Sequence, residues 1–139
     1  MEEAIRFVEG NDELARALGV EGPEELAVRP LAQGEHNVNF LLRAGDGRRF
    51  VLRINCASQL GLADQIGYEY GALRVLAPSG RTPEPLYVDG TRRRIGRGVL
   101  VESFVEGSWI DLRDPRQVRE AARALADVHS VCRAAGRRA

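Results

Sequence analysis

The stretch Phe50-Val51-Leu52-Arg53-Ile54 decides the fold that the sequence predicts. Successive side chains of a strand point to opposite faces, so its three large apolar residues share one face while Val51 and Arg53 share the other. Residues 38–42 alternate in the same way, and residues 44–47 (Ala-Gly-Asp-Gly) between the two runs are typical of a turn. The pattern predicts an antiparallel β-hairpin with an arginine on one of its faces.

A helical pattern follows the hairpin, from about Leu60 to Ala77, and Pro78-Ser79-Gly80 ends it. Its apolar stripe has a carboxylate, Glu69, in the middle; the other members are Leu62, Ile66, Leu73 and Leu76. A carboxylate in apolar surroundings is strongly unfavourable unless it is paired, and Arg53 is the nearest natural partner in the sequence. The alternative is that Glu69 lies at the edge of the stripe in water, because exposed carboxylates are much commoner than buried ones.

Further helical and strand signals lie on both sides of this unit. Asn11 before an apolar series and Gly19 after it predict a short helix near the start of the chain. Segments 85–88 and 99–104 have the character of strands, and an arginine-rich hairpin from residue 89 to residue 98 joins them.

The last helix is the best marked in the chain. Asp114-Pro115-Arg116-Gln117 places an acidic cap, a proline at the first helical position and a glutamine at the third, which is a variant of the capping box. A stripe that we expect to face the core follows, and Gly136 suits its end; the stripe is Val118, Ala121, Ala122, Leu125, His129 and Cys132. The order of elements predicts an α+β fold: a five-stranded antiparallel sheet with one packed helix, plus this C-terminal helix.

Composition excludes several classes of protein. The 139 residues suit one domain, and twenty basic residues, all arginine, balance twenty acidic ones. Without net charge there is no global field for nucleic acid or an anionic membrane, and without lysine there is no P-loop and no Schiff-base chemistry. The acidic start lacks the features of a secretory signal, no apolar run is long enough to span a membrane, and Cys56 and Cys132 are isolated. We expect a cytoplasmic soluble protein with reduced thiols, no metal site of its own, and neither nucleic acid nor membrane as a partner.

Six stretches, in order over roughly residues 28–131, carry a resemblance to a known family; they are 31–40, 50–54, 68–73, 82–88, 99–107 and 124–129. The N-lobe of a kinase has the following parts in order: a strand, a polar turn, a strand, a basic residue on the third strand, a glutamate on the next helix, and a strand that ends in a small loop. The sequence resembles the aminoglycoside phosphotransferase and choline kinase-like family of small-molecule kinases. The resemblance implies a kinase-like N-lobe and hinge at residues 1–107, with 1–26 as a helical extension, and a linker and the first helix of a truncated large lobe at 108–139.

The resemblance also implies a nucleotide site. The polar turn would cover the nucleotide phosphates, Arg53 would contact them, and Glu69 would be its partner on the helix. The backbone of the hinge, around Ser103 and Val105, would meet the edge of the adenine, between apolar walls at Leu31 and Val51. The nucleotide-binding residues implied in this way are Leu31, Gln33, Gly34, Glu35, His36, Asn37, Asn39, Val51, Arg53, Glu69, Ser103, Phe104 and Val105.

The catalytic loop of this family, a histidine with an aspartate two residues on and a later asparagine, has no counterpart here. The two histidines, His36 and His129, lack that aspartate. We therefore expect the nucleotide-binding part of an ATP- or GTP-dependent phosphotransferase that acts on a hydroxyl of a small molecule such as an aminoglycoside, a choline-like alcohol or a sugar alcohol. Mg²⁺ ligands would lie in the large lobe, and the 139-residue chain alone would be inactive and prone to self-association through its uncovered last helix. The alternative is a stand-alone, non-catalytic binding or regulatory module.

Three further features have two interpretations each. Residues 92–94 with Arg97 form either a phosphate- or RNA-binding cluster or, as we expect, the solvated tip of a hairpin. His129 is interpreted as a core-facing residue of the last helix, although it could be a ligand. Trp109 is interpreted as a packing residue at the rim of the cleft, with stacking on a substrate as the alternative.

Overall fold

The computed structural model describes residues 1–58 and 61–136. The chain order begins with helices α1 (Glu2–Val8) and α2 (Asp12–Leu18) and a 3₁₀ turn η1 (Pro23–Glu25). Strands β1 (Ala27–Gln33), β2 (Asn37–Arg43) and β3 (Arg49–Asn55) follow, then α3 (Gln65–Leu76), η2 (Ala77–Ser79), β4 (Pro85–Asp89), β5 (Val99–Ser103) and α4 (Pro115–Gly136). Within these residues, none of the helices combines the length and the apolar character needed to cross a membrane.

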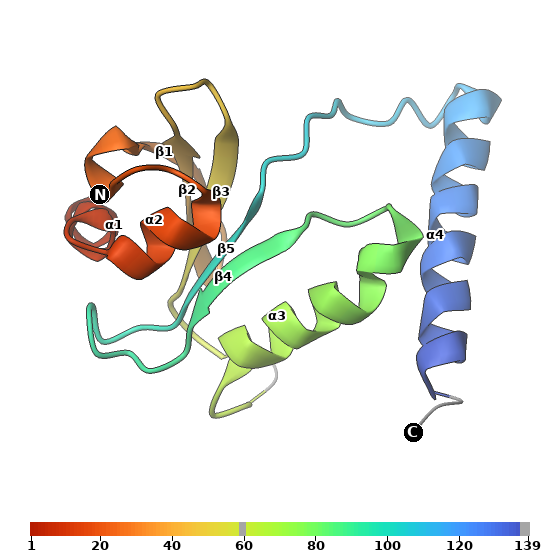
Figure 1. Cartoon of the computed structure of the whole chain (residues 1–139). Helices are drawn as coiled ribbons and strands as arrows, with labels where there is room; N and C mark the ends of the chain where they lie inside the picture. The colour runs from red at the N-terminus through yellow and green to blue at the C-terminus, as the bar shows by residue number, and fades with distance from the viewer. Residues whose placement is uncertain (59–60, 137–139) are drawn as a thin grey trace.

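The five strands form one antiparallel sheet in the order β1-β2-β3-β5-β4, which confirms the predicted fold class. Helices α1 and α2 lie on one side of this sheet, and α3 and α4 lie on the other (Figure 1). The predicted hairpin is present, with Phe40 opposite Leu52 and Asn39 opposite Arg53. A five-stranded sheet with a helix packed on one face is the arrangement of a kinase-like N-lobe.

The hydrophobic core lies under α1 and α2. Alternate residues of the strands meet the apolar faces of these helices; the buried set includes Phe7, Leu14, Leu18, Phe40, Leu42, Phe50, Leu52, Ile54, Val99 and Val101. The ring of Phe7 also packs edge-on against Tyr87, with the ring centroids 6.2 Å apart. The residues that the sequence places in a helical extension therefore supply one whole side of the core.

Helix α2 has the two ends that its sequence predicts. The buried side chain of Asn11 accepts a hydrogen bond from the Leu14 backbone N–H at 3.1 Å, and Gly19 ends the helix in the left-handed region at φ 64°. Arg48, in the β2–β3 turn, donates to the carbonyl oxygens of Leu18 and Gly19 at 2.7 and 2.8 Å. These bonds satisfy carbonyl groups that a helix end leaves unpaired, and they fix α2 to the hairpin.

Helix α3 begins later than the sequence predicts. The side chain of Asp64 accepts a hydrogen bond from the Gly67 N–H at 3.0 Å, so the helix starts at Gln65. Leu62 lies before the helix and is 39% exposed, so it is not a member of the stripe. Leu60, where the predicted helix begins, lies outside the described residues. The predicted end is confirmed, because η2 follows directly and Gly80 is left-handed at φ 65°.

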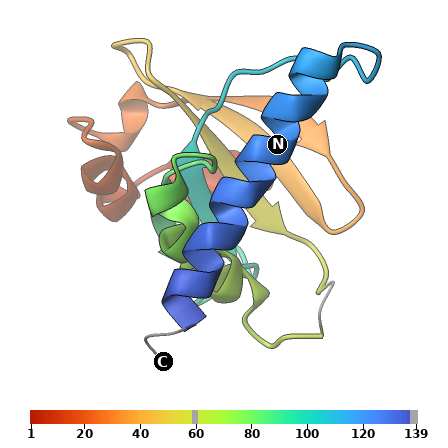
Figure 2. The same ribbon diagram turned by 90° about the vertical axis from the view of Figure 1, so that its right-hand side faces the viewer.

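Helix α4 has the predicted start but a different contact face. Asp114 accepts from the Arg116 N–H at 2.9 Å, whereas the Gln117 side chain accepts from Asp111 and not from the cap residue. The helix contacts α3 and η2, in front of which it runs in Figure 2, and it stands apart from the sheet in Figure 1. Its half-buried residues are Ala121, Ala124, Val128, Val131 and Ala135, and no residue of α4 is buried. The predicted core stripe is therefore wrong: of its six members only Ala121 is half-buried, while Val118, Ala122, Leu125, His129 and Cys132 are exposed.

Candidate functional site

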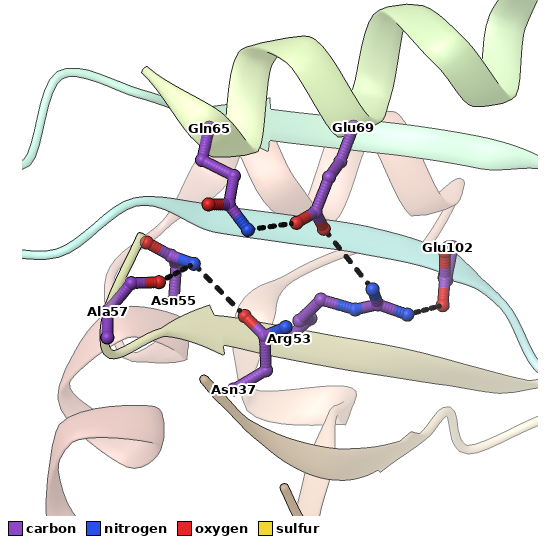
Figure 3. A network of polar contacts seen from close by, with 7 residues as sticks. All are labelled: Asn37, Arg53, Asn55, Ala57, Gln65, Glu69 and Glu102. Carbon is purple, nitrogen blue, oxygen red and sulfur yellow. Dashed lines mark hydrogen bonds and ion pairs between the residues drawn. The ribbon is translucent and has the colours of Figure 1, made fainter. Parts of the chain in front are cut away.

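Arg53 lies between two carboxylates on the face of the sheet opposite the main core (Figure 3). One of its terminal nitrogens is 3.2 Å from Glu69 Oε2 on α3, and the other is 3.0 Å from Glu102 Oε1 on β5. The predicted pairing of Arg53 with Glu69 is thus present. The alternative, with Glu69 in water at the edge of the stripe, is wrong, because its side chain is only 21% exposed.

Glu102 is the most buried member of this cluster. Its side chain is 5% exposed, and burial raises the pKa of its carboxyl above the usual range. The Arg53 guanidinium opposes this shift because it favours the charged form of the carboxylate, while the nearby negative charge of Glu69 adds to it. One guanidinium is shared by two carboxylates, so the negative charge of Glu69 acts in the same direction as burial and favours the protonated form of Glu102.

A second layer of amides surrounds the three charged groups. Gln65, one turn before Glu69 on α3, donates from Nε2 to Glu69 Oε1 at 2.8 Å and holds that carboxylate in place. Asn55, at the end of β3, donates from Nδ2 to Asn37 Oδ1 at 3.2 Å and to the Ala57 carbonyl at 3.0 Å (Figure 3). These bonds connect the end of β3 with the beginning of β2.

Two buried polar atoms of this face have no hydrogen-bond partner in the described residues. They are the Arg53 Nε–H and the side-chain oxygen Oδ1 of Asn39, the residue opposite Arg53 on β2. A buried donor without an acceptor is unfavourable, and an incoming anionic oxygen or a water molecule would satisfy it. The cluster therefore retains one unused donor, the Arg53 Nε–H, and one unused acceptor on the neighbouring strand.

A pocket of about 260 Å³ opens beside this cluster, between α3 and β5. Its charged end consists of Arg53, Glu69 and Glu102, and its apolar walls come from α3 and from Pro83. The remaining lining residues are Tyr68, Ala72, Leu73 and Leu76.

The polar turn between β1 and β2 reaches the end of β3. Gly34 N–H donates to Asn37 O at 2.9 Å and closes the turn, and the His36 carbonyl accepts from Cys56 N–H at 2.8 Å. Of the predicted contact residues here, Leu31, Gln33, Gly34 and Glu35 are exposed, whereas His36, Asn37 and Asn39 are half-buried. Leu31 is the extra residue of a bulge in β1, between Pro30 and Ala32 in the register.

The predicted hinge follows β5 and contacts the beginning of β3. Ser103 is tied to Glu84 by two hydrogen bonds, and Phe104 lies against the Arg49 guanidinium, 4.6 Å from the ring centroid. Val105 is 61% exposed, and in the described part of the chain its backbone N–H donates to no other group. Val51, on the face shared with Arg53, is half-buried and faces the same side of the sheet.

The arginine-rich hairpin has the exposed tip that the sequence predicts, since Arg92, Arg93 and Arg94 are all exposed. Three of its arginines also contact the body of the molecule: Arg92 donates to Ala63 O at 2.6 Å, Arg94 to Gly10 O at 3.3 Å, and Arg97 to Cys56 Sγ at 2.9 Å. The expected packing of Trp109 is wrong, because its side chain is 98% exposed.

Glu102 is the site residue that sequence reasoning missed. The signal is present, because a carboxylate interrupts an otherwise apolar strand, Val99 to Val101, just as Arg53 interrupts its own. The pairing of β5 with β3 was also needed to find it, since Glu102 lies opposite Val51 and so faces the side of the sheet that Arg53 faces. In the described residues, no group of three or more His, Cys, Asp or Glu side chains could hold a metal ion.

Comparison with known families decides where this arrangement belongs. The model of the phosphotransferase enzyme family matches residues 27–139, which include all five strands, α3, the predicted hinge and α4. The chain belongs to this family. The family resemblance expected from the polar turn, Arg53, Glu69 and the hinge is thereby confirmed.

The chain is also similar to curated homoserine kinases. It is 33% identical over 127 residues to "Homoserine kinase" of Rhizobium meliloti (strain 1021), and equally so to that of Sinorhizobium fredii (strain NBRC 101917 / NGR234). Each match covers 85% of this chain and 37% of the relative, so the chain spans little more than a third of the length of these proteins. No solved structure matches.

Proposed function

We propose that this chain provides the nucleotide-phosphate-binding part of an ATP- or GTP-dependent phosphotransferase that acts on a hydroxyl group of a small molecule. The observation that carries the proposal is the Arg53 guanidinium, held between carboxylates from α3 and β5 while its buried Nε–H has no acceptor. A phosphate oxygen satisfies such a donor with a charge-assisted hydrogen bond. Membership of the phosphotransferase family supports the same assignment.

The residues would divide the work of binding between the two ends of the nucleotide. Arg53 contacts the phosphates, Glu69 and Gln65 hold its guanidinium in position, and the turn at residues 33–39 covers the phosphates from above. The backbone of Ser103 and Val105 meets the edge of the base, and Leu31 and Val51 pack on its faces. Nucleotide and Mg²⁺ neutralise each other's charge, and phosphoryl transfer depends mainly on positioning and electrostatic stabilisation.

The acceptor that the relatives favour is an amino acid with a side-chain hydroxyl. Both similar proteins are named homoserine kinase, and the similarity extends over 85% of this chain. We therefore place homoserine, or a hydroxyl compound of that size, ahead of aminoglycosides, choline-like alcohols and sugar alcohols. The proposal for the acceptor rests on the relatives alone.

Nucleotide binding by the 139-residue chain tests the proposal. Titration calorimetry with ATP and with GTP, each with Mg²⁺, should show saturable binding at one site. Arg53→Ala should weaken it about tenfold or more, as expected for loss of a charge-assisted contact. The matched control is Arg93→Ala, which removes the same charge from an exposed position whose side chain makes no hydrogen bond or ion pair in the described residues. Equal weakening by both substitutions, or no binding at all, would overturn the assignment of Arg53.

Turnover is a separate measurement on the same material. We expect the chain to bind nucleotide without transferring the phosphoryl group to homoserine, because no His-x-Asp sequence supplies a general base. Release of labelled ADP in proportion to the concentration of the purified chain, and lost with Arg53→Ala, would show that other residues supply the base.

A further inference from the structure

Another cavity, with two arginines in its lining, lies at the C-terminal end of β3, beginning two residues after Arg53. It has a volume of about 350 Å³ and is lined by three segments: residues 55–58, which begin with the last residue of β3, residues 62–63 before α3, and Arg92 with residues 96–98 from the β4–β5 connection. The lining contains two guanidinium groups and, among the described residues, no carboxylate. We propose that this cavity binds a phosphate group through Arg92 and Arg97, a site distinct from Arg53.

Both arginines are fixed before any ligand arrives. Arg92 donates to the Ala63 carbonyl at 2.6 Å, and its backbone is left-handed at φ 60°, the only such residue other than glycine in the described chain. The turn is closed by a hydrogen bond of 2.8 Å from Gly96 N–H to the Arg92 carbonyl. A conformation that is unfavourable for an arginine persists only where its surroundings hold it, and Arg92 is one of the residues that line the cavity.

Arg97 is anchored by two contacts of its own. It donates to Cys56 Sγ at 2.9 Å, and its Nε lies 3.4 Å from Glu3 Oε1 on α1. A guanidinium has five N–H donors, so these contacts and the one made by Arg92 leave several donors on each side chain. Glu3 is 43% exposed and outside the lining, so it screens Arg97 only weakly.

The chemistry of this cavity selects an oxyanion. Two guanidinium groups on one concave surface repel each other. A dianionic phosphate relieves this repulsion and accepts hydrogen bonds from the N–H groups of both guanidiniums. Ser58 adds a hydroxyl to the lining. A carboxylate carries a single charge and two oxygens, so it satisfies fewer of these donors. Inorganic phosphate and the phosphate of a small monoester offer the same chemistry.

An occupant would lie against the segment that anchors the β1–β2 turn. Cys56 and Ala57 N–H groups both donate to the His36 carbonyl, and Asn55 holds Asn37. Phosphate in the cavity would therefore stabilise this turn. The inference does not depend on the proposed function, because it uses neither Arg53 nor the hinge.

Titration of the ¹⁵N-labelled chain with inorganic phosphate, at constant ionic strength set with chloride, tests the site. The amide signals of Cys56, Ser58 and Gly98 should move along a saturating curve. Arg97→Gln and Arg92→Asn should each weaken binding about tenfold or more; asparagine is chosen because it tolerates the left-handed backbone. Arg93→Gln, the neighbouring charge without a side-chain contact, should change affinity by less than about twofold.

Further titrations distinguish free phosphate from a phosphate monoester, and this cavity from Arg53. If the cavity accepts a phosphate monoester, glycerol phosphate should bind with the same affinity as inorganic phosphate. Weaker binding of glycerol phosphate would assign the cavity to the free phosphate ion. Acetate should bind at least about tenfold more weakly than phosphate. Arg53→Ala should leave phosphate binding unchanged. Loss of binding with Arg53→Ala, equal effects of Arg93→Gln and Arg97→Gln, equal affinity for acetate, or shifts without saturation would each overturn the inference. The pattern of amide signals outside the cavity shows whether each variant is folded.

Discussion

The two faces of the sheet are built from the same strands but have opposite characters. Under α1 and α2, every second residue is a large apolar side chain, and Leu42, Leu52 and Val101 are fully buried. Under α3, the residues in between include Arg53 and Glu102, paired across the sheet and open to a pocket on one side. One face supplies stability and the other holds charge in partial burial, where an arginine and a carboxylate interact far more strongly than in water.

The difference shows how this fold positions a charged site without making it part of the core. A strand fixes Val51 and Arg53 relative to Leu52 within a few ångströms, because the backbone is shared. Packing on the sealed face, under α1 and α2, therefore holds the strands in register. The same register fixes the positions of the side chains on the open face, under α3. Substitutions of neighbouring residues on the two faces test whether one face supplies the stability and the other positions the charged groups.

The largest effect is expected on the sealed face. Leu52→Ala removes a side chain with no exposed surface and leaves a cavity, so it should lower the free energy of unfolding by about 2–5 kcal/mol. Val51→Ala, one residue away on the open face and half-buried, should cost about half of that or less. Urea unfolding followed by circular dichroism measures both. Equal losses would show that the two faces contribute alike.

Arg53→Ala should have the next largest effect. It leaves two carboxylates, one almost fully buried, without their shared cation, which costs about 3–5 kcal/mol in a buried pair and about 0–1 in an exposed one. At 30% exposure for Arg53 we expect about 1–3 kcal/mol. A double-mutant cycle should show stronger coupling of Arg53 to Glu102 than to Glu69. A larger coupling to Glu69 would place the stabilising contact on α3.

A pH series sharpens the role of Glu102. Its pKa is raised in the folded chain, so the folded state binds this proton more tightly than the unfolded state. The stabilisation from protonation is complete below the ordinary glutamate pKa and is lost as the pH rises through the raised value. Glu102→Gln should remove this slope from the free energy of unfolding, whereas Glu106→Gln, on an exposed side chain, should keep it. Parallel curves for the wild type and Glu102→Gln would contradict the prediction.

The smallest effect on stability is expected on α4. Leu125 is 57% exposed on the side away from α3, so Leu125→Ser should change the free energy of unfolding by no more than about 0.5 kcal/mol. We propose that the exposed side of α4, with Val118 and Leu125, associates with other molecules at high protein concentration. Sedimentation velocity should then show less association for the variant. A wild-type chain that is monomeric at every concentration measured would contradict this proposal.

Sequence alone predicted the sheet and the Arg53–Glu69 pair because both depend on local patterns. The alternation of apolar and polar residues identifies β2 and β3 directly. A charged residue within a row of apolar residues is expected to have a partner of opposite charge. The stripe on α4 failed for a physical reason. Its apolar residues recur at two phases about one residue apart, 118, 122 and 125 or 121, 124, 128 and 131, and only packing against α3 selects the second. Glu102 was missed because its position depends on the non-local pairing of β3 with β5.

The helices α1 and α2 have a practical consequence for anyone who divides this protein. The family match begins at residue 27, the first residue of β1, yet Phe7, Leu14 and Leu18 fill the space under the strands. The start of the family match and the start of the cooperatively folded unit therefore differ by about two helices. An expression clone cut at the former would display Leu42, Leu52 and Val101 to solvent and deprive Arg48 of both its carbonyl acceptors. Such a truncated polypeptide should aggregate, however well its sequence matches the family.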